Sequence, residues 1–465
     1  MGRRFAALGM ASGVALSLLA IPGVAQAAVS PDCAISQATG GGTPSNTITL
    51  PEPTAGDMSS TIEAAFARSG SETVVQRPGT YYITRPVVIP RGDVFDGAGI
   101  DLSRLKALPG HNVNPMVKLQ GDATLRNMTV DQNGADPSSR QDLSQYTVDV
   151  RGSNNDVDHT KIVGYTTYAL VAAGAERFCF HNGVILGDPA LNGRFNQLDG
   201  AHVLNSRLGD VVRMYVDGRY NGATAGDDSF VAHVIDGGTV SDVRYVDNVA
   251  RAGANGTAFA VWPYSGNITR ISFSGNEVWG DGQIGHGEGY GGSRGTFTDS
   301  SITDNIVHNT GENAISMAGK NLTVTGNKTC STGPIRVTGS NNTVGNNSVY
   351  SGCVAEPSWS PGDPPVIDPP KPAVNQPPQV NAGLDRIVRV GRNVRLNGVV
   401  TDDGLPIGAL GYVWEAVSGP AIVPFSNPWD LHSLTRFDKP GKYVLRLKGS
   451  DGAVEVQDLL VDIAR

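Results

Sequence analysis

Short runs of alternating apolar and polar residues recur along the chain between about residues 210 and 350. Each run covers six to eight positions, is rich in β-branched residues and is bounded by Gly, Asn or Asp, which predicts a strand. One such unit cannot bury its apolar face alone, whereas stacked units share a continuous core. The runs end at steps of 28, 29, 22 and 19 residues, at Asn248, Asn276, Asn305, Asn327 and Asn346.

The unequal steps distinguish between kinds of solenoid. A strict hexapeptide or nonapeptide repeat would keep one step length, whereas a parallel β-helix accepts loops of different size on one side. We therefore predict an all-β fold, a right-handed parallel β-helix whose Val, Ile, Leu and Phe side chains point inward. The Asn that ends each run is expected to adopt the left-handed turn conformation.

A helical pattern precedes the repeats. Residues 56–70 place Ile62, Ala65 and Phe66 on one face, which predicts an amphipathic helix with a Ser cap that covers the open end of the β-helix. PGTYYI and DGAG follow, and together with the helix they resemble the N-terminus of the pectate-lyase-like superfamily. This resemblance spans about residues 50–350 and implies a β-helical carbohydrate enzyme without specifying its reaction.

The C-terminal part has a different pattern. A Pro-rich stretch over 355–378 predicts an extended linker, and short strands with tight turns then predict an immunoglobulin-like β-sandwich over 379–465. Its motifs NAGLDRIV, VTDDG, YVWEAVSGP and FDKPGKYVLRLKGSDG resemble a PKD-type module. The resemblance implies that Trp414 is a core residue and not a platform for sugars. The β-helix then occupies 28–354.

Residues 1–27 carry the features of a secretory signal peptide: Arg3 and Arg4, an apolar stretch, and the triplet Ala-Gln-Ala at 25–27. No later segment is as long as a membrane span, so we expect a secreted, extracellular protein. Two disulfides are then expected among four cysteines, with free thiols as the alternative. Of three possible connectivities we prefer Cys330 with Cys353, which close a short loop, and Cys33 with Cys179.

Composition narrows the classes of partner. The 59 Gly and 28 Pro residues fit a turn-rich β protein. The formal charge of −8 and the absence of a Lys/Arg cluster argue against nucleic acid and, unless the cleft is basic, against an acidic polysaccharide. We expect a monomer without cofactor or metal; Asp402, Asp403 and Asp451 are turn residues or, alternatively, calcium ligands.

The register between coils decides which side chains meet. Aligning MYVDGRY with YVDNVAR pairs Gly218 with Asn248, an offset of 30 residues. At that offset Asp227 and Asp228 lie beside Thr257 and its neighbour. Adjacent strand residues point to opposite faces, so both carboxylates reach solvent only if the strand bends there, which the preceding Gly makes possible.

Two more polar side chains are expected to stack above and below the Asp pair, in one column of residues from successive coils. Asp199 precedes Asp227 by 28 residues, about one coil, which places the carboxylates within roughly 5–9 Å of one another. A further step of 28 residues places Gly285 beside Thr257 and His286 beside Ala258, with His286 about 10 Å from Asp228 because a whole coil intervenes. Clustered carboxylates raise at least one pKa by like-charge repulsion and so keep one acid protonated.

Three sequence motifs suggest a catalytic role for the residues of this column. LDG at 198–200, GDD at 226–228 and GHG at 285–287 resemble the active-site motifs of glycoside hydrolase family 28, the polygalacturonases. NGATAGDDSF with NGTAFAVW resembles still more the mycodextranases and α-1,3-glucanases of family 87. The resemblance implies an inverting hydrolase in which Asp227 is the general acid and Asp199 and Asp228 hold and deprotonate water.

The chain departs from family 28 in two ways. The extra coil before the GHG motif leaves open whether His286 binds substrate or is only a turn residue. The RIK-type basic motif that grips a uronic carboxylate is absent, which favours a neutral polysaccharide such as an α-glucan. Trp262, Tyr264 and Tyr290 lie beside the column and could stack on sugar rings, although Trp262 also fits a core position.

Two other functions remain open at this point. A polysaccharide lyase or epimerase on the same fold would act on uronic acids with a base and a cation, and the column has few basic neighbours. A non-catalytic adhesin or glycan-binding solenoid would use the same surface without chemistry.

Overall fold

The computed structural model describes residues 31–38, 40, 46–68, 71–253, 256–280, 282–308, 313–330, 335–349, 377–401, 411–450 and 455–465. The predicted signal peptide, Cys353 and the turn residues Asp402, Asp403 and Asp451 lie outside the described residues. Within the described part of the chain, no helix combines the length and the apolar character needed to cross a membrane.

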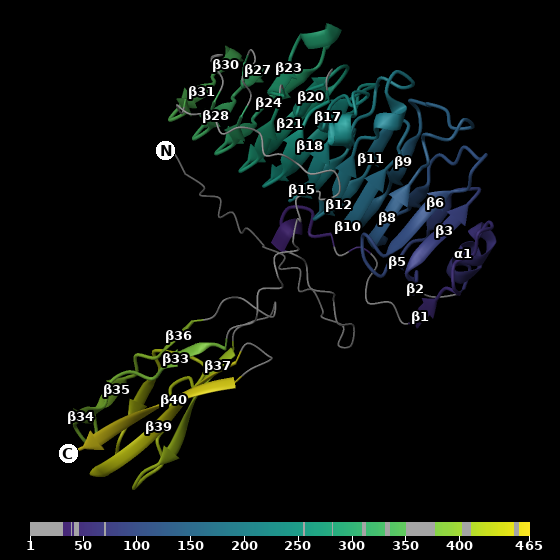
Figure 1. Ribbon diagram of the computed structural model, residues 1–465. Helices are drawn as coiled ribbons and strands as arrows, with labels where there is room; N and C mark the ends of the chain where they lie inside the picture. Colours follow the sequence, from purple (N-terminus) through teal and green to yellow (C-terminus); the bar gives the residue numbers. More distant parts are fainter. Residues whose placement is uncertain are drawn as a thin grey trace, which may run out of the picture.

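Among the described residues, thirty-two strands pair side by side in parallel and wind into one long β-helix, which confirms the predicted fold (Figure 1). The strands form three columns that run along the helix. One column carries the candidate site and is called the site column: β4 (Val87–Ile89), β7 (Val117–Leu119), β9 (Tyr146–Val150), β11 (Tyr168–Ala173), β14 (Ala201–Leu204), β17 (Phe230–Val234), β20 (Phe259–Pro263), β23 (Ile284–Gly287), β27 (Ile315–Lys320) and β30 (Arg336–Ser340).

The other two columns close each coil. The second contains β1 (Asn46–Thr49), β2 (Glu72–Val75), β5 (Val94–Asp96), β8 (Thr124–Asp131), β10 (Ser153–Val163), β12 (Glu176–His181), β15 (Arg207–Val212), β18 (Thr239–Val246), β21 (Asn267–Ser274), β24 (Thr296–Thr298), β25 (Ser301–Thr303), β28 (Thr323–Thr325) and β31 (Thr343–Gly345). The third contains β3 (Gly79–Ile83), β6 (Ser103–Ala107), the ends of β8 and β10, β13 (Val184–Leu186), β16 (Tyr215–Asp217), β19 (Val249–Arg251), β22 (Glu277–Trp279), β26 (Ile306–Val307), β29 (Lys328–Thr329) and β32 (Ser348–Val349).

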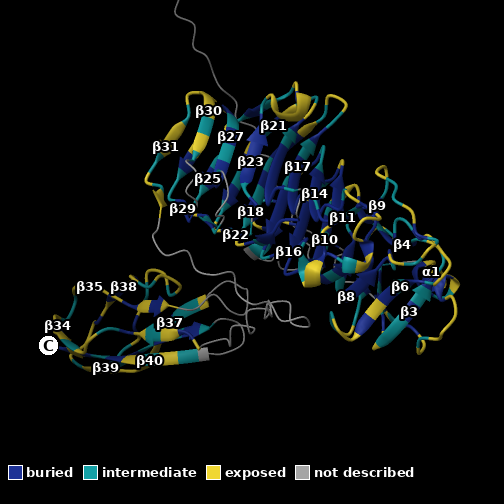
Figure 2. Cartoon of the chain, turned by 45° about the horizontal axis from the view of Figure 1, so that its top comes forward, coloured by how far each residue is buried: buried dark blue, intermediate teal, exposed yellow. Residues whose placement is uncertain are grey.

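The core lies inside the coils, where alternate strand residues point inward. Figure 2 shows buried residues concentrated in the strands and exposed residues in the loops. Equivalent inward side chains of neighbouring coils stack on one another: the rings of Phe230 and Phe259 lie 4.7 Å apart at 8°, and those of Tyr245 and Phe273 lie 4.8 Å apart. Stacking of like side chains fixes the register, because a slip of one residue would turn them outward.

An internal ladder of Asn side chains supports one corner, and it corrects the predicted role of these residues. The amide of Asn248 donates to Oδ1 of Asn276 at 2.9 Å, and this amide-to-amide bond repeats from Asn276 to Asn305, Asn327 and Asn347. The left-handed conformation belongs to the position before each ladder residue, namely Asp247, Gly275, Asp304, Gly326 and Asn346, so the prediction of this conformation is confirmed for Asn346 alone among the five predicted Asn residues. The last run therefore ends in the ladder one residue later than predicted.

Helix α1 (Ser59–Phe66) is the predicted amphipathic helix, shorter than the predicted 56–70. Ile62, Ala65 and Phe66 are buried as expected, and the ring of Phe66 meets Phe95 edge-on at 5.6 Å. The predicted Ser cap is wrong: the carboxylate of Asp57 accepts from the backbone N–H of Ser59 at 3.0 Å. The chain also forms short turns of 3₁₀ helix at η1 (Pro31–Cys33), η2 (Pro189–Leu191), η3 (Tyr220–Gly222) and η4 (Tyr290–Gly292).

A disulfide joins the N-terminal segment to the side of the β-helix. Cys33 and Cys179 form this bond, as predicted. Cys330 is also disulfide-bonded, and Cys353, its predicted partner, lies outside the described residues. Asp210 strengthens the attachment, because its buried carboxylate accepts from the backbone N–H of Ser36 at 2.7 Å.

The C-terminal part is a β-sandwich, as predicted. Its four-stranded sheet has the order β34 (Arg386–Val388), β40 (Glu455–Ala464), β39 (Gly441–Ser450) and β37 (Gly411–Ser418). Two strand pairs complete it: β33 (Gln379–Asn381) with β36 (Val399–Thr401), and β35 (Asn393–Arg395) with β38 (Leu434–Arg436). Trp414 is 1% exposed at the centre of its apolar core, which confirms its predicted place.

Candidate active site

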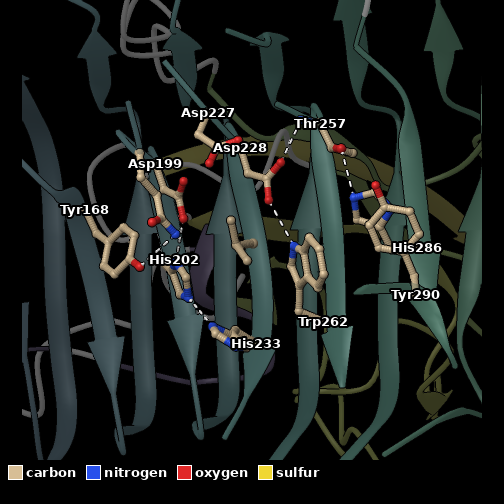
Figure 3. A pocket seen from close by; sticks show the side chains of 12 residues that line it. Tyr168, Asp199, His202, Asp227, Asp228, His233, Thr257, Trp262, His286 and Tyr290 are labelled. Atoms are coloured by element: carbon tan, nitrogen blue, oxygen red, sulfur yellow. Dashed lines mark hydrogen bonds and ion pairs between the residues drawn. The ribbon is translucent and has the colours of Figure 1, made fainter. Parts of the chain in front are cut away.

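Six of the seven side chains predicted to form the site line one cavity on the site column (Figure 3). The cavity has a volume of about 270 Å³. Tyr264, the seventh, is 52% exposed and does not line it. The lining residues are Tyr168, Gln197, Asp199, His202, Asp227, Asp228, Val231, His233, Thr257, Trp262, His286 and Tyr290.

The coil register places Asp199 and the Asp pair as predicted. Leu198 pairs with Gly226, so Asp199 lies one coil before Asp227. The next step differs by one residue, because β17 pairs with β20 at an offset of 29, Phe230 with Phe259, where 30 was predicted.

The register of two further positions was predicted wrongly. His286 pairs with Val261 and not with Ala258 as predicted, although it is still two coils from Asp228. The predicted pairing of Gly218 with Asn248 is also wrong, because Asp217 pairs with Arg251. A longer turn causes this shift: Leu204 to Arg207 spans three positions, whereas the matching stretch from His233 to Ser241 spans eight.

A β-bulge explains how two adjacent carboxylates face the same cavity. From Leu198 to Ala201 the chain advances three positions, whereas the paired stretch from Gly226 to Phe230 advances four. The extra residue breaks the alternation of side chains, as bulges beside functional sites commonly do. The bend expected after Gly226 is therefore present, and both Asp227 and Asp228 line the cavity.

Asp228 is held by two donors from the next coil. The backbone N–H of Thr257 donates to its Oδ1 at 2.6 Å, and the indole Nε1–H of Trp262 donates to its Oδ2 at 3.0 Å (Figure 3). Burial and the nearby charge of Asp199 raise the pKa of Asp228 to about 7, while these two hydrogen bonds oppose the rise. The bonds favour the ionised carboxylate, because both donors need an acceptor.

Asp227 has contrasting surroundings. In the described part of the chain, its side chain has no hydrogen-bond or ion-pair partner, and it is partly exposed to the cavity. Burial, then the charges of Asp199 and Asp228, raise its pKa to about 8. With nothing to stabilise its anion, Asp227 is protonated at neutral pH.

Asp199 is the most enclosed carboxylate of the three. Its Oδ2 lies 3.2 Å from Nδ1 of His202, and its Oδ1 is buried without a hydrogen-bond partner among the described residues. Burial raises the pKa of Asp199 to about 7. A buried oxygen without a partner beside two other carboxylates is suited to hold a water molecule or a sugar hydroxyl.

Aromatic rings form one wall of the cavity. His286 and Tyr290 stack at 3.9 Å and 13°, and Trp262 lies 4.8 Å from His286 and 5.1 Å from Tyr290. Nε2 of His286 also lies 3.0 Å from the hydroxyl of Thr257, the residue that binds Asp228 through its backbone. His286 is thus tied to the site through Thr257 and Trp262, and it has no bond to a carboxylate of the described residues.

Sequence reasoning missed His202 and His233, which line the cavity on the side opposite the aromatic wall. A signal existed: alternate residues of a strand share a face, and His233 follows Val231 on the outward face and pairs with Trp262. Marking every second residue of β14 and β17 as outward-facing would have placed both imidazoles on the same face as the carboxylates.

A second cavity of about 230 Å³ adjoins the first along the site column. It shares His286 and Tyr290 with the first cavity and reaches Ser316 on β27 and Arg336 on β30. The two cavities together form a groove that crosses several coils.

Among the described residues, one group of side chains has ligand atoms close enough together to hold a metal ion, and this group lies outside the cavity. The ligand atoms of Cys33, Asp156, Cys179 and His181 are within 4.8 Å of one another. The two sulfur atoms form the disulfide, so they are not available as thiolate ligands.

The search against protein families finds no matching model. Among solved structures, the chain is similar to the Dettilon tailspike protein gp208 (TM-score 0.38, 10% identity, 88% of this chain and 91% of that chain). It is similar to PfbA, a surface adhesin of Streptococcus pneumoniae (TM-score 0.35, 11%, 65% and 93%), and to the PKD domain from the KIAA 1837 protein (TM-score 0.16, 21%, 19% and 85%). Likenesses this distant say nothing about activity.

Proposed function

We propose that this protein is an exported glycoside hydrolase that cleaves a neutral polysaccharide, such as an α-glucan, with inversion. The observation that supports this most is the presence of three carboxyl groups in one cavity, of which two have different hydrogen-bond partners and the third, Asp227, has none among the described residues. Inverting hydrolysis needs a protonated acid on one side of the scissile bond and ionised carboxylates that activate water on the other.

The surroundings of the three carboxyl groups suggest their roles. Asp227 lacks a partner that would stabilise its anion and has the highest pKa, about 8, so it protonates the leaving oxygen. Asp228 accepts two hydrogen bonds and Asp199 has the imidazole of His202 beside it, so these two hold and deprotonate water. These are the roles that the resemblance to family 28 implies.

The lining of the cavity favours a neutral sugar. Among the described residues it contains no Lys or Arg, so a uronic carboxylate would meet three carboxyl groups without a compensating cation from this lining. Trp262 and Tyr290 offer the aromatic faces on which sugar rings stack. A lyase or epimerase acting on uronic acids would need a cation at this place.

The shape of the groove favours a polymer. The first cavity is smaller than the ~300–1,000 Å³ that encloses a drug-sized ligand, and the second continues it along the coils. A glycan chain would place one residue beside the carboxyl groups and the following residues past His286 toward Arg336.

Two further features belong to this proposal. The Cys33–Cys179 disulfide fits a protein that works outside the cell, where such bonds persist. The C-terminal sandwich is proposed to be a PKD-type module that attaches the enzyme to an insoluble glycan or spaces it from one.

A panel of neutral and acidic polysaccharides tests the proposal. We expect new reducing ends from a neutral glucan, with α-to-β inversion seen by proton NMR and no absorbance near 235 nm. Absorbance near that wavelength would mean a lyase, and binding without release of any product would mean an adhesin. Asp227→Asn serves as the inactive control in each assay.

A further inference from the structure

A chain of three polar side chains leads from the most buried carboxyl group to the open part of the cavity. Oδ2 of Asp199 lies 3.2 Å from Nδ1 of His202, and Nε2 of the same ring lies 3.2 Å from Nδ1 of His233 (Figure 3). Asp199 and His202 are buried, whereas His233 is partly exposed. This series of three side chains therefore has one buried end, at Asp199, and one end accessible to solvent, at His233.

Packing fixes the two imidazoles in this arrangement. The ring of His202 lies 4.8 Å from Tyr168 on one side and 5.3 Å from His233 on the other. His233 occupies an outward position of β17, paired with Trp262. Neither ring can turn away without losing contact with a neighbouring ring, so packing between two adjacent coils fixes the spacing of the three groups.

The hydrogen bonds couple the tautomers of both rings to the charge of Asp199. When Asp199 is ionised, Nδ1–H of His202 donates to it, and Nδ1–H of His233 donates to Nε2 of His202. When Asp199 is protonated, its O–H donates to Nδ1 of His202, whose Nε2–H donates to Nδ1 of His233. The two states differ by one proton, which enters or leaves at Nε2 of His233, and both rings are neutral in each.

We propose that His202 and His233 form a proton relay through which Asp199 exchanges its proton with solvent while substrate or product fills the cavity. The relay itself rests on the hydrogen bonds, and its role in turnover rests on the proposed hydrolase function. His202 and His233 are relay and positioning residues, since neither is required to touch the sugar.

The relay supplies a step that inverting hydrolysis needs. Water adds to the anomeric carbon as its proton passes to Asp199, the glycosidic C–O bond breaks, and Asp227 gives its proton to the leaving oxygen. Asp199 then carries one extra proton and Asp227 lacks one. Asp199 passes its proton to His202, His202 passes one to His233, and His233 releases one to solvent, while the partly exposed Asp227 takes one up directly.

The surroundings keep the rings neutral in the resting states. Burial lowers the pKa of His202 to about 4, and burial with the neighbouring His202 lowers that of His233 to about 3. In the part of the chain that the structure describes, no Lys or Arg lines the cavity. The titratable groups that face the relay from the adjoining coils are Tyr168 from β11, Asp227 and Asp228 from the bulge before β17, and His286 from β23.

Nitrogen-15 NMR of histidine rings in the substrate-free protein tests the relay independently of any activity. As pH rises through about 7, we expect both rings to change together from the Nε2–H to the Nδ1–H tautomer. Asp199→Asn should abolish this change, whereas Asp227→Asn should preserve it. Tautomers that stay constant from pH 5 to 9, or that change in only one ring, would overturn the relay even if the protein proves to be a hydrolase.

Kinetics then tests the role in turnover. His233→Gln keeps a donor and an acceptor but cannot pass a proton between them, so kcat should fall at least ~10-fold with KM unchanged. Adding imidazole buffer to His233→Ala should restore part of kcat. The matched control is His308→Gln, since the ring of His308 is also hydrogen-bonded, here to Glu277, but lies outside the cavity.

A wild-type kcat in His233→Gln would show that the relay has no role in turnover. The proposed hydrolase function would be unaffected by that result. A loss of kcat that imidazole does not restore, with tautomers that never switch, would mean that His233 is merely structural. An inactive wild type with switching tautomers would instead contradict the hydrolase proposal and keep the relay.

Discussion

Asp227 and Asp228 are neighbours in the chain, yet they differ in almost every contact. The bulge gives both of them access to the cavity, but the donors Thr257 and Trp262 reach only Asp228. Asp227 is left without a partner among the described residues and keeps its proton to a higher pH. One fold feature thus gives two adjacent Asp side chains different surroundings, as the proposed acid and base roles require.

Substitution of these two residues tests the assignment at the residue scale. Asp227→Asn and Asp228→Asn should each reduce kcat by at least the ~10²–10⁴-fold that acid–base groups contribute, with the fold intact. Circular dichroism and melting temperature check the fold, and Asp236→Asn, on an exposed turn, is the matched control. Near-wild-type turnover of either active-site variant on the true substrate would contradict the assignment.

The raised pKa values also predict how stability depends on pH. A carboxyl group whose pKa rises from ~4 in the unfolded chain to about 8 in the folded protein binds more protons when folded. The free energy of unfolding should therefore fall as pH rises from 4 to 8. Asp227→Asn should reduce this fall and raise the melting temperature at pH 8 relative to wild type; equal slopes in both proteins would contradict the raised pKa.

Sequence analysis found the site residues that stand in short motifs. It missed the residues that only the strand register identifies. Asp199, Asp227 and Asp228 stand in short Gly-containing motifs whose spacing equals one coil, and the structure brings them into one cavity. His202 and His233 stand in ordinary alternating strands, so only the exact register shows that their rings meet. Tyr264 has the right composition but lies beyond the end of its strand, where the loop directs it away.

At the scale of elements, the bulge depends on a close approach between coils. Gly256 lies against the backbone of the Asp pair: a Cβ atom there would be 2.0 Å from the carbonyl carbon of Asp227 and 2.6 Å from the nitrogen of Asp228. Backbone atoms cannot move aside as a flexible side chain can. The backbone at Gly256, in the following coil, therefore holds the bulge in place.

Gly256→Ala should displace the bulge. We expect a loss of roughly 1–3 kcal/mol in the free energy of unfolding, as overpacking commonly causes, and a larger proportional loss of kcat. Gly345→Ala is the matched control, because a Cβ atom at Gly345 meets nothing within 4 Å. Urea unfolding and initial rates measure the two effects, and a variant as active and stable as the control would show that the bulge does not need this contact.

At the scale of the whole molecule, the fold follows from the repeat, while its offsets follow from the turns. Stacked Phe and Tyr rings and the Asn ladder repeat between neighbouring coils from Phe230 to Asn347, so even a sequence pattern with unequal steps predicts a parallel β-helix. Five extra residues between His233 and Ser241 then shift the register of the next column from 29 to 34. Turn length is not encoded in the apolar pattern, which explains why the predicted offset of 30 was wrong.

The same scale decides what the C-terminal sandwich contributes. Every residue that lines the first cavity lies between 168 and 290, and the sandwich has its own core around Trp414. Two separate cores imply that the two parts fold independently. Removal of the sandwich should therefore leave the carboxyl groups, the relay and the groove unchanged.

Truncation after residue 358 tests this expectation. The shortened protein should keep its melting transition for the β-helix and its kcat on soluble oligosaccharides, because no lining residue is lost. Activity on the insoluble form of the same glycan should fall, since attachment would depend on the sandwich. Adding the separate sandwich in trans should not restore that activity, because the benefit comes from the covalent link. A truncated protein that is folded but inactive on short soluble substrates would show instead that the sandwich helps to shape the groove.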